Sequence, residues 1–86
     1  MEFGFDPAKS ASNLEKHGID VHTVQEIWQD AMRVEIPART TDEPRSLVVG
    51  QIDNKHWSVV VTYRGQQVGI ISAHRSRKEE VALYEG

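Results

Sequence analysis

The chain has 86 residues, of which 38% are hydrophobic and 27% are charged, and its formal net charge is −3 at pH 7. This length predicts one domain, residues 1–86, with a small core. The absence of cysteine excludes disulfides, thiolate metal sites and a cysteine nucleophile. A net negative charge argues against a protein that coats nucleic acids. With no signal peptide and no apolar run of about 20 residues, we expect a cytoplasmic protein that does not contact a membrane.

A short strand and a helix are predicted at the start of the chain. Phe3 and Phe5 alternate with Glu2 and Gly4, which is typical of a short edge strand. Asp6 and Pro7 have the chemistry of an N-cap followed by a first helical residue. The helix is therefore expected over residues 7–17 and should end at Gly18.

This first helix has two faces of different character. Ala8, Ala11 and Leu14 recur every three residues and are predicted to form its core face. The other face carries polar groups at helical spacing, namely Lys9, Asn13, Lys16 and His17. The polar face is either simply solvated or part of a binding site, and the helix alone does not decide between them.

A second helix of about three turns is predicted to follow at once. Asp20 is its N-cap candidate, and apolar residues recur at helical spacing from Val21 to Ala31. A connection of only a few residues predicts that the two helices form a hairpin. A short strand is then expected over residues 34–37, where Pro37 ends it.

The second half of the chain predicts three consecutive antiparallel strands and a final helix. The strands are expected over residues 45–52, 56–63 and 68–73, with short turns between them, and residues 38–45 are expected to form a loop. Ser76 and Glu79 have the spacing of a capping box, which predicts that the last helix starts just after Ser76.

The predicted order of elements is therefore β-α-α-β-β-β-β-α. It indicates an α+β fold in which an antiparallel sheet packs against the N-terminal helical hairpin, with a helix at the C-terminus. The side chains expected in the core are Leu14, Val24, Ile27, Trp28, Val59, Val61 and Ile71.

Cationic and imidazole side chains are the candidate functional groups. Residues 64–78 contain Arg64, Arg75, Arg77 and Lys78 and no acid. Together with Lys9, Lys16 and two histidines, His17 and His74, these groups suit RNA cleavage without a metal. Histidine can act as acid or base, and arginine or lysine can bind phosphate. The four histidines of the chain are scattered, so no metal site is expected.

Two observations count against a single site formed by all of these residues. The basic residues near the last strand are equally compatible with a solvated basic turn. The antiparallel pairing of the last two strands also predicts that Arg64 and Arg75 lie at opposite ends of their hairpin.

Several short motifs together resemble the BrnT toxin family. They are Phe5-Asp6-Pro7-Ala8-Lys9, Asn13, Lys16-His17-Gly18, the strand from Arg45 to Gly50, Tyr63-Arg64, Ile70-Ile71-Ser72-Ala73 with Arg75, and Tyr84-Glu85. The resemblance implies a ribonuclease toxin of a type II toxin–antitoxin system with a RelE-like fold. It implies inhibition of translation by RNA cleavage, and no cofactor. It also implies a BrnA-type antitoxin as partner. The antitoxin binds DNA, and the toxin is associated with DNA only through the antitoxin.

The resemblance also bears on the residues of the site. It supports His17, Arg64 and Arg75 as catalytic candidates and Lys9 and Lys16 as RNA-binding candidates. His74 is added as an acid/base group, and Arg77, a cation at the start of the last helix, as a further RNA-binding candidate. The chain departs from the family's pattern at Gly69, His74 and Val81, where members usually or often have arginine. Two interpretations follow: an active ribonuclease, or a catalytically weakened protein that acts mainly as an antitoxin-binding module.

Overall fold

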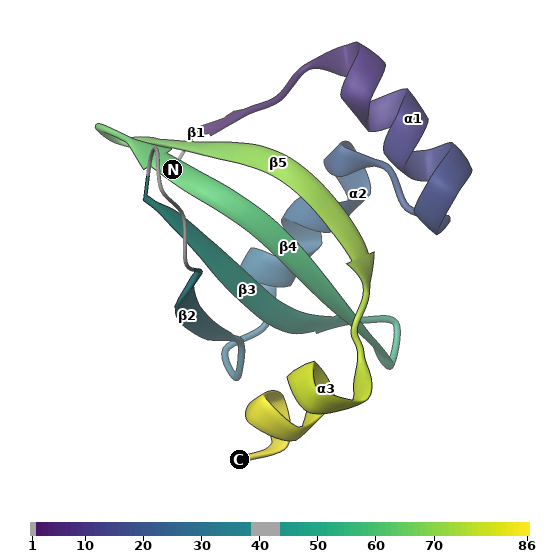
Figure 1. The fold of residues 1–86 in the computed structure, drawn as a ribbon, viewed down its shortest axis with the longest axis vertical. Helices are drawn as coiled ribbons and strands as arrows, with labels where there is room; N and C mark the ends of the chain where they lie inside the picture. Colours follow the sequence, from purple (N-terminus) through teal and green to yellow (C-terminus); the bar gives the residue numbers. More distant parts are fainter. Residues whose placement is uncertain (1, 39–43) are drawn as a thin grey trace.

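The computed structural model describes residues 2–38 and 44–86, which form a five-stranded sheet with helices around it (Figure 1). The predicted α+β class and the order of the elements are confirmed. Of the loop expected over residues 38–45, residues 39–43 lie outside the described part. In chain order the elements are β1 (Glu2–Gly4), α1 (Pro7–His17), α2 (Val21–Val24), the 3-10 helix η1 (Gln25–Gln29), β2 (Val34–Ala38), β3 (Arg45–Ile52), β4 (Lys55–Arg64), β5 (Gln67–Arg75) and α3 (Lys78–Glu85).

The sheet is mixed, so the prediction of a purely antiparallel sheet is wrong at one edge. The strand order is β1-β5-β4-β3-β2, and β2 to β5 pair antiparallel as predicted. β1 instead pairs with the start of β5 in parallel. Hairpin turns force neighbouring strands to reverse, whereas strands separated by a long connection are free to run the same way. β1 and β5 are separated by residues 5–66, a connection long enough to allow this.

The apolar core lies between one face of the sheet and the segment α2–η1. Val24 and Ile27 of this segment and Val59 and Val61 of β4 are all completely buried, which confirms four of the predicted core residues. Trp28 is only partly buried and packs edge-to-face on Phe3 with ring centroids 5.0 Å apart. Ile71 is half-buried.

The second helix begins as predicted but does not continue as three α turns. The Asp20 carboxylate accepts a hydrogen bond from the Thr23 N–H at 2.6 Å, which confirms the N-cap. After Val24 the backbone tightens into η1. In a 3-10 helix residues three apart lie on one face, so this change keeps Val24 and Ile27 stacked over the sheet.

Helix α1 has the predicted limits, with Asp6 as its N-cap and Gly18 as its C-terminal residue in the left-handed conformation (φ 79°). Its predicted core face is wrong, however, because Leu14 is 49% exposed, and Ala8 and Ala11 are also exposed. The helix buries Ser10 and Asn13 instead.

The burial of polar residues follows from where α1 lies. β1 pairs only with residues 67–69 of β5, and α1 packs beside the rest of that strand (Figure 1). The Asn13 amide accepts the Ala73 N–H at 3.0 Å and donates to the Ile19 carbonyl at 2.8 Å. The Ser10 hydroxyl accepts the Val21 N–H at 3.0 Å. The backbone N–H and C=O groups along the open edge of a strand need hydrogen-bond partners. A helix that packs there must supply polar side chains, because apolar side chains cannot form these hydrogen bonds.

Candidate functional site

Several of the candidate side chains lie on the sheet face opposite the α2–η1 segment. Side chains alternate along β4, so Ser58, Thr62 and Arg64 point to the face away from Val59 and Val61. His74 of β5 is the partner of Ser58 in the register and lies on the same face. Helix α3 also packs there, because the Ser58 hydroxyl donates to the Glu80 carboxylate at 2.9 Å. This face is therefore bordered by α1 beside β5 and by α3 at its far end (Figure 1).

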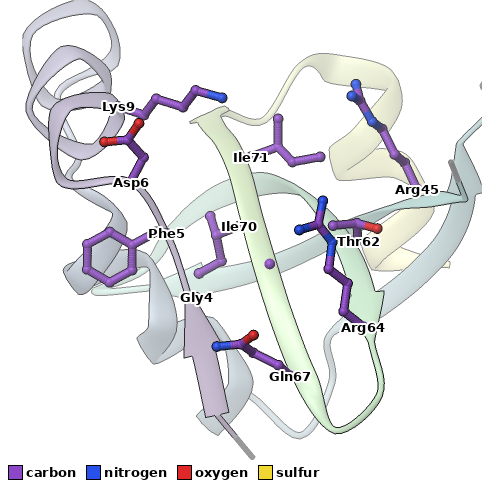
Figure 2. A pocket seen from close by; sticks show the side chains of 11 residues that line it. Gly4, Phe5, Asp6, Lys9, Arg45, Thr62, Arg64, Gln67, Ile70 and Ile71 are labelled. Carbon is purple, nitrogen blue, oxygen red and sulfur yellow. The ribbon is translucent and has the colours of Figure 1, made fainter. Parts of the chain in front are cut away.

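The first of two adjoining hollows on this side of the molecule is lined by three cationic side chains, and we call it the cationic pocket (Figure 2). It has a volume of about 380 Å³. Lys9 reaches it from α1, Arg45 from the start of β3 and Arg64 from the end of β4. The remaining lining residues are Gly4, Phe5, Asp6, Thr62, Gln67, Gly69, Ile70 and Ile71.

The composition of the cationic pocket suits a nucleic-acid chain. In Figure 2 the Lys9 amine lies on the α1 side of β5, and the Arg64 and Arg45 guanidiniums lie on the other side. Phosphate groups bind such cations, and arginine can grip two phosphate oxygens at once. Phe5 also lines this pocket and is 38% exposed, but its ring points away from Arg45 and Arg64 (Figure 2).

The second hollow has a volume of about 190 Å³, and we call it the histidine pocket. Lys9 and Ile71 line both hollows, so the two adjoin. The other lining residues are Ser12, Asn13, Lys16, His17 and Ser72. The imidazoles of His17 and His74 lie with their centroids 6.5 Å apart. The structure thus brings together the two histidines that the sequence proposed as acid and base.

His74 is held by a carboxylate that the candidate list did not include. Its Nε2 atom lies 3.0 Å from Oε1 and 3.3 Å from Oε2 of Glu80. Both side chains are largely enclosed, with 20% and 12% of their respective surfaces exposed. A carboxylate on one nitrogen fixes the orientation of an imidazole ring and selects which nitrogen carries the proton.

Glu80 is itself fixed by further donors. Its Oε1 accepts the Ser58 hydroxyl at 2.9 Å and the Arg77 backbone N–H at 2.8 Å, and Ser58 in turn contacts the Ser76 hydroxyl at 2.7 Å. Burial raises the pKa of the Glu80 carboxyl, but hydrogen bonds from Arg77, Ser58 and His74 outweigh burial and hold it below its usual value. Glu80 is therefore ionised at neutral pH.

The capping interaction at α3 differs from the prediction by one residue. The helix begins at Lys78, and Glu80 rather than Glu79 reaches back to the N–H of the capping residue, Arg77. The Ser76 hydroxyl is engaged with Ser58 and does not cap the helix. The predicted pair Ser76 and Glu79 is wrong because Ser76 is drawn into this contact with β4.

The register separates Arg64 from the histidine pair, as the hairpin predicted. Arg64 pairs with Gln67 beside the turn, whereas Ser58 pairs with His74 toward the other end of the two strands. Six residues of strand separate Ser58 from Arg64, which corresponds to about 20 Å. One phosphate group cannot contact both Arg64 and His74 over that distance.

Arg75 and Arg77 stand apart from the two pockets. Arg75 pairs with Trp57 on the sheet face opposite His74, and its guanidinium carbon lies 5.7 Å from the Trp57 ring centroid. Arg77 is exposed at the start of α3. Of the candidates, the structure thus gathers Lys9, Lys16, His17, Arg64 and His74 around the two pockets, and leaves out Arg75 and Arg77.

Two residues of this region were missed from the sequence. The sequence predicts Arg45 only as the first residue of a strand, and a cation at that position is a signal that it can reach the sheet face. Glu80 has no signal of its own in the sequence, because Glu79 is the residue with the capping-box spacing from Ser76. In the described part of the chain, no group of three or more His, Asp or Glu side chains could hold a metal ion. No helix in this part is long and apolar enough to cross a membrane.

Comparison with known families finds a match over most of the chain. Residues 5–80 match the family model described as the ribonuclease toxin BrnT of type II toxin–antitoxin systems. Comparison with curated proteins gives no match. The matched range runs from Phe5 of the cationic pocket to Glu80 beside His74 and includes every lining residue of the two pockets except Gly4. The chain belongs to the BrnT family of ribonuclease toxins of type II toxin–antitoxin systems.

Proposed function

We propose that this chain is a metal-independent endoribonuclease that cleaves RNA in the cytoplasm and so inhibits translation. The observation that carries the proposal is the 6.5 Å separation of the His17 and His74 rings beside two adjoining pockets that contain four cationic side chains. Two imidazoles can supply both proton transfers of RNA cleavage. Histidine is the residue type most often used as a general acid or base in enzymes.

The reaction that fits this pair is attack by a ribose 2′-oxygen on the adjacent phosphorus. One imidazole takes the 2′-hydroxyl proton as the O2′–P bond forms. The other protonates the 5′-oxygen as the P–O5′ bond breaks. The products are a 2′,3′-cyclic phosphate and a free 5′-hydroxyl. Lys16 lines the histidine pocket together with His17 and is placed to stabilise the negative charge that grows on the phosphate oxygens.

The cationic pocket serves binding in this proposal. Within this pocket Arg64 lies about 20 Å along β4 from Ser58, the residue opposite His74, and this spacing suits a phosphate several nucleotides from the cleaved bond. We therefore assign RNA binding to Arg64, together with Arg45, rather than the catalytic role that the resemblance implied for Arg64. Lys9 lines both pockets and would connect the two regions. Arg75, on the other sheet face, receives no role in the reaction.

The family implies an antitoxin partner, and we propose that it is of the BrnA type and covers the cationic and histidine pockets. Acidic groups on such a partner would complement Lys9, Lys16, Arg45 and Arg64. DNA would then be contacted only by the antitoxin. We also propose the RelE-like fold relationship, which the five-stranded sheet with helices at its edge and end supports.

Controlled expression tests the proposal. We expect growth arrest with RNA degradation when the chain is expressed alone, and normal growth when the antitoxin is expressed with it. The His74→Ala protein, expressed to the same level, should not arrest growth. Normal growth and intact RNA with the unmodified chain would contradict the proposal and favour a module that only binds the antitoxin.

A further inference from the structure

The pairing of His74 with Glu80 has a consequence for how the proposed reaction is arranged. The carboxylate approaches only one of the two ring nitrogens, Nε2, at 3.0 Å from Oε1 and 3.3 Å from Oε2. The groups that face His74 from the surrounding elements are His17 of α1, Ser58 of β4 and Glu80 of α3. Glu80 is the acidic member of this set.

Glu80 lies where the chain turns from β5 into α3, and its carboxylate accepts hydrogen bonds there from Ser58 and Arg77. Ser58 is fully buried, and its hydroxyl donates to Oε1 while it contacts the Ser76 hydroxyl. Since Ser58 has one proton to donate, Ser76 must donate to Ser58. The Ser76 N–H also bonds the His56 carbonyl at 3.0 Å, which fixes the corner to β4. The carboxylate therefore has a fixed position and accepts rather than donates toward His74.

We propose that Glu80 is a positioning residue that holds the proton of His74 on Nε2 and leaves Nδ1 to exchange a proton with RNA. This inference rests on the proposed ribonuclease function. With Nε2 protonated, neutral His74 accepts the 2′-hydroxyl proton at Nδ1 and becomes an imidazolium, whose charge the Glu80 carboxylate balances. His17 then gives its proton to the departing 5′-oxygen. His74 is the base and His17 the acid.

The choice of variants follows from the second role of Glu80 in capping α3. Glu80→Gln keeps an oxygen that can accept the Arg77 N–H and the Ser58 hydroxyl, but it removes the charge. Glu79→Gln is the matched control, since Glu79 is exposed in the same first turn and its replacement removes the same charge. Thermal unfolding should show both variants folded.

The first experiment observes the ring directly by nitrogen-15 NMR of the purified unmodified protein at about pH 8.5, above the ordinary histidine range. We expect His74 to be the Nε2–H tautomer with a proton resonance protected from exchange, and the same in Glu79→Gln. In Glu80→Gln that resonance should shift and exchange faster with water, because a neutral amide oxygen replaces the carboxylate. A Nδ1–H tautomer, or a resonance unaffected by Glu80→Gln, would overturn the inference.

The second experiment measures cleavage of a defined RNA in a double-mutant cycle. Glu80→Gln should lower kcat at least about 10-fold, by no more than the loss of about 10²–10⁴ expected for a missing base, and change KM by less than about twofold. In the His74→Ala background it should cause no further loss, because a positioning residue acts only through its partner. Independent, multiplicative losses would overturn the inference. If the unmodified protein does not cleave RNA, the proposed function fails, while the NMR result still decides whether Glu80 sets the tautomer.

Discussion

His17, the last residue of α1, and His74, near the end of β5, lie with ring centroids 6.5 Å apart and the rings tilted by 59°, although they are far apart in the sequence. One hydrogen bond explains much of this proximity. The Ala73 N–H donates to Asn13 at 3.0 Å. Asn13 is one helical turn before His17 and on the same side of α1, and Ala73 directly precedes His74. Asn13 thus aligns the two elements that carry the imidazoles.

Replacing Asn13 by Ala should destabilise the protein by about 1–3 kcal/mol. The change leaves the Ala73 N–H and the Ile19 carbonyl, both buried partners of Asn13, without that side chain. Urea unfolding measures the loss, with the exposed Glu15→Ala on the same helix as control. A loss as small as that of Glu15→Ala would show that Asn13 does not hold α1 in place.

Replacing either His17 or His74 by Ala should lower the rate constant of RNA cleavage by about 10²–10⁴-fold, because each removes one of two proton-transfer groups. His22→Ala is the matched control, since His22 is exposed on α2 and lies outside both pockets. Kinetics at matched protein concentration provide the measurement. If His74→Arg preserved or raised the activity, His74 would only replace a cation and would not transfer protons.

Replacing Arg64 by Ala should weaken RNA binding more than it lowers kcat, because Arg64 lies about 20 Å along the strands from the histidine pair. The dependence of log affinity on log salt should decrease by about 0.7 for one lost phosphate contact to single-stranded RNA. Arg75→Ala removes the same charge on the other sheet face and should leave binding unchanged. Equal effects of the two changes would contradict the assignment of the cationic pocket.

Replacing Ile27 by Ala should cost about 2–5 kcal/mol of stability, because the side chain is completely buried between η1 and the sheet. Leu14→Ala removes a comparable apolar side chain that is 49% exposed, and we expect it to cost less than about 1 kcal/mol. Denaturant unfolding of both variants compares the two positions. A loss of stability in Leu14→Ala as large as that in Ile27→Ala would show that the apolar face of α1 is buried after all.

Stability should fall at acid pH, and Glu80 should contribute to the fall. Its pKa in the folded protein lies below the ordinary value of 4.5, since hydrogen bonds from Arg77, Ser58 and His74 outweigh the effect of burial. Ionised Glu80 therefore stabilises the fold above about pH 4.5, and this contribution is lost as the pH falls through the lower folded value. The melting temperature measured from pH 7 to pH 3 should decrease less for Glu80→Gln than for Glu79→Gln. Identical curves would contradict this.

The limits of α1 could be predicted because they depend on local sequence signals. The side of α1 that is buried could not be predicted, because it depends on contacts with residues far away in the sequence. Asp6, Pro7 and Gly18 define the helix limits through short-range chemistry, and the structure confirms them. The buried side of α1 depends on Asn13 and Ala73, which are 60 residues apart in sequence. A polar side chain that is buried because it satisfies a distant strand edge has no periodic signature, so the apolar residue Leu14 was the natural but wrong choice.

The candidate site was predictable in residue type and only partly in geometry. The imidazoles and cations were recognisable from the sequence, and antiparallel pairing correctly separated Arg64 from Arg75. Whether His17 and His74 meet depends on how α1 docks beside β5, which the sequence does not specify. Glu80 differs from Glu79 by one position, and only the course of the chain between β5 and α3 determines which of them faces His74.

Cleavage of a defined RNA by the purified protein in the presence of EDTA tests the central claim most directly. Mass spectrometry of the fragments should find 2′,3′-cyclic phosphate and 5′-hydroxyl ends with the unmodified protein, and His74→Ala should produce these ends at least about 100-fold more slowly. Intact RNA, cleavage abolished by EDTA, or full activity of His74→Ala would contradict a metal-independent reaction carried out by the His17–His74 pair.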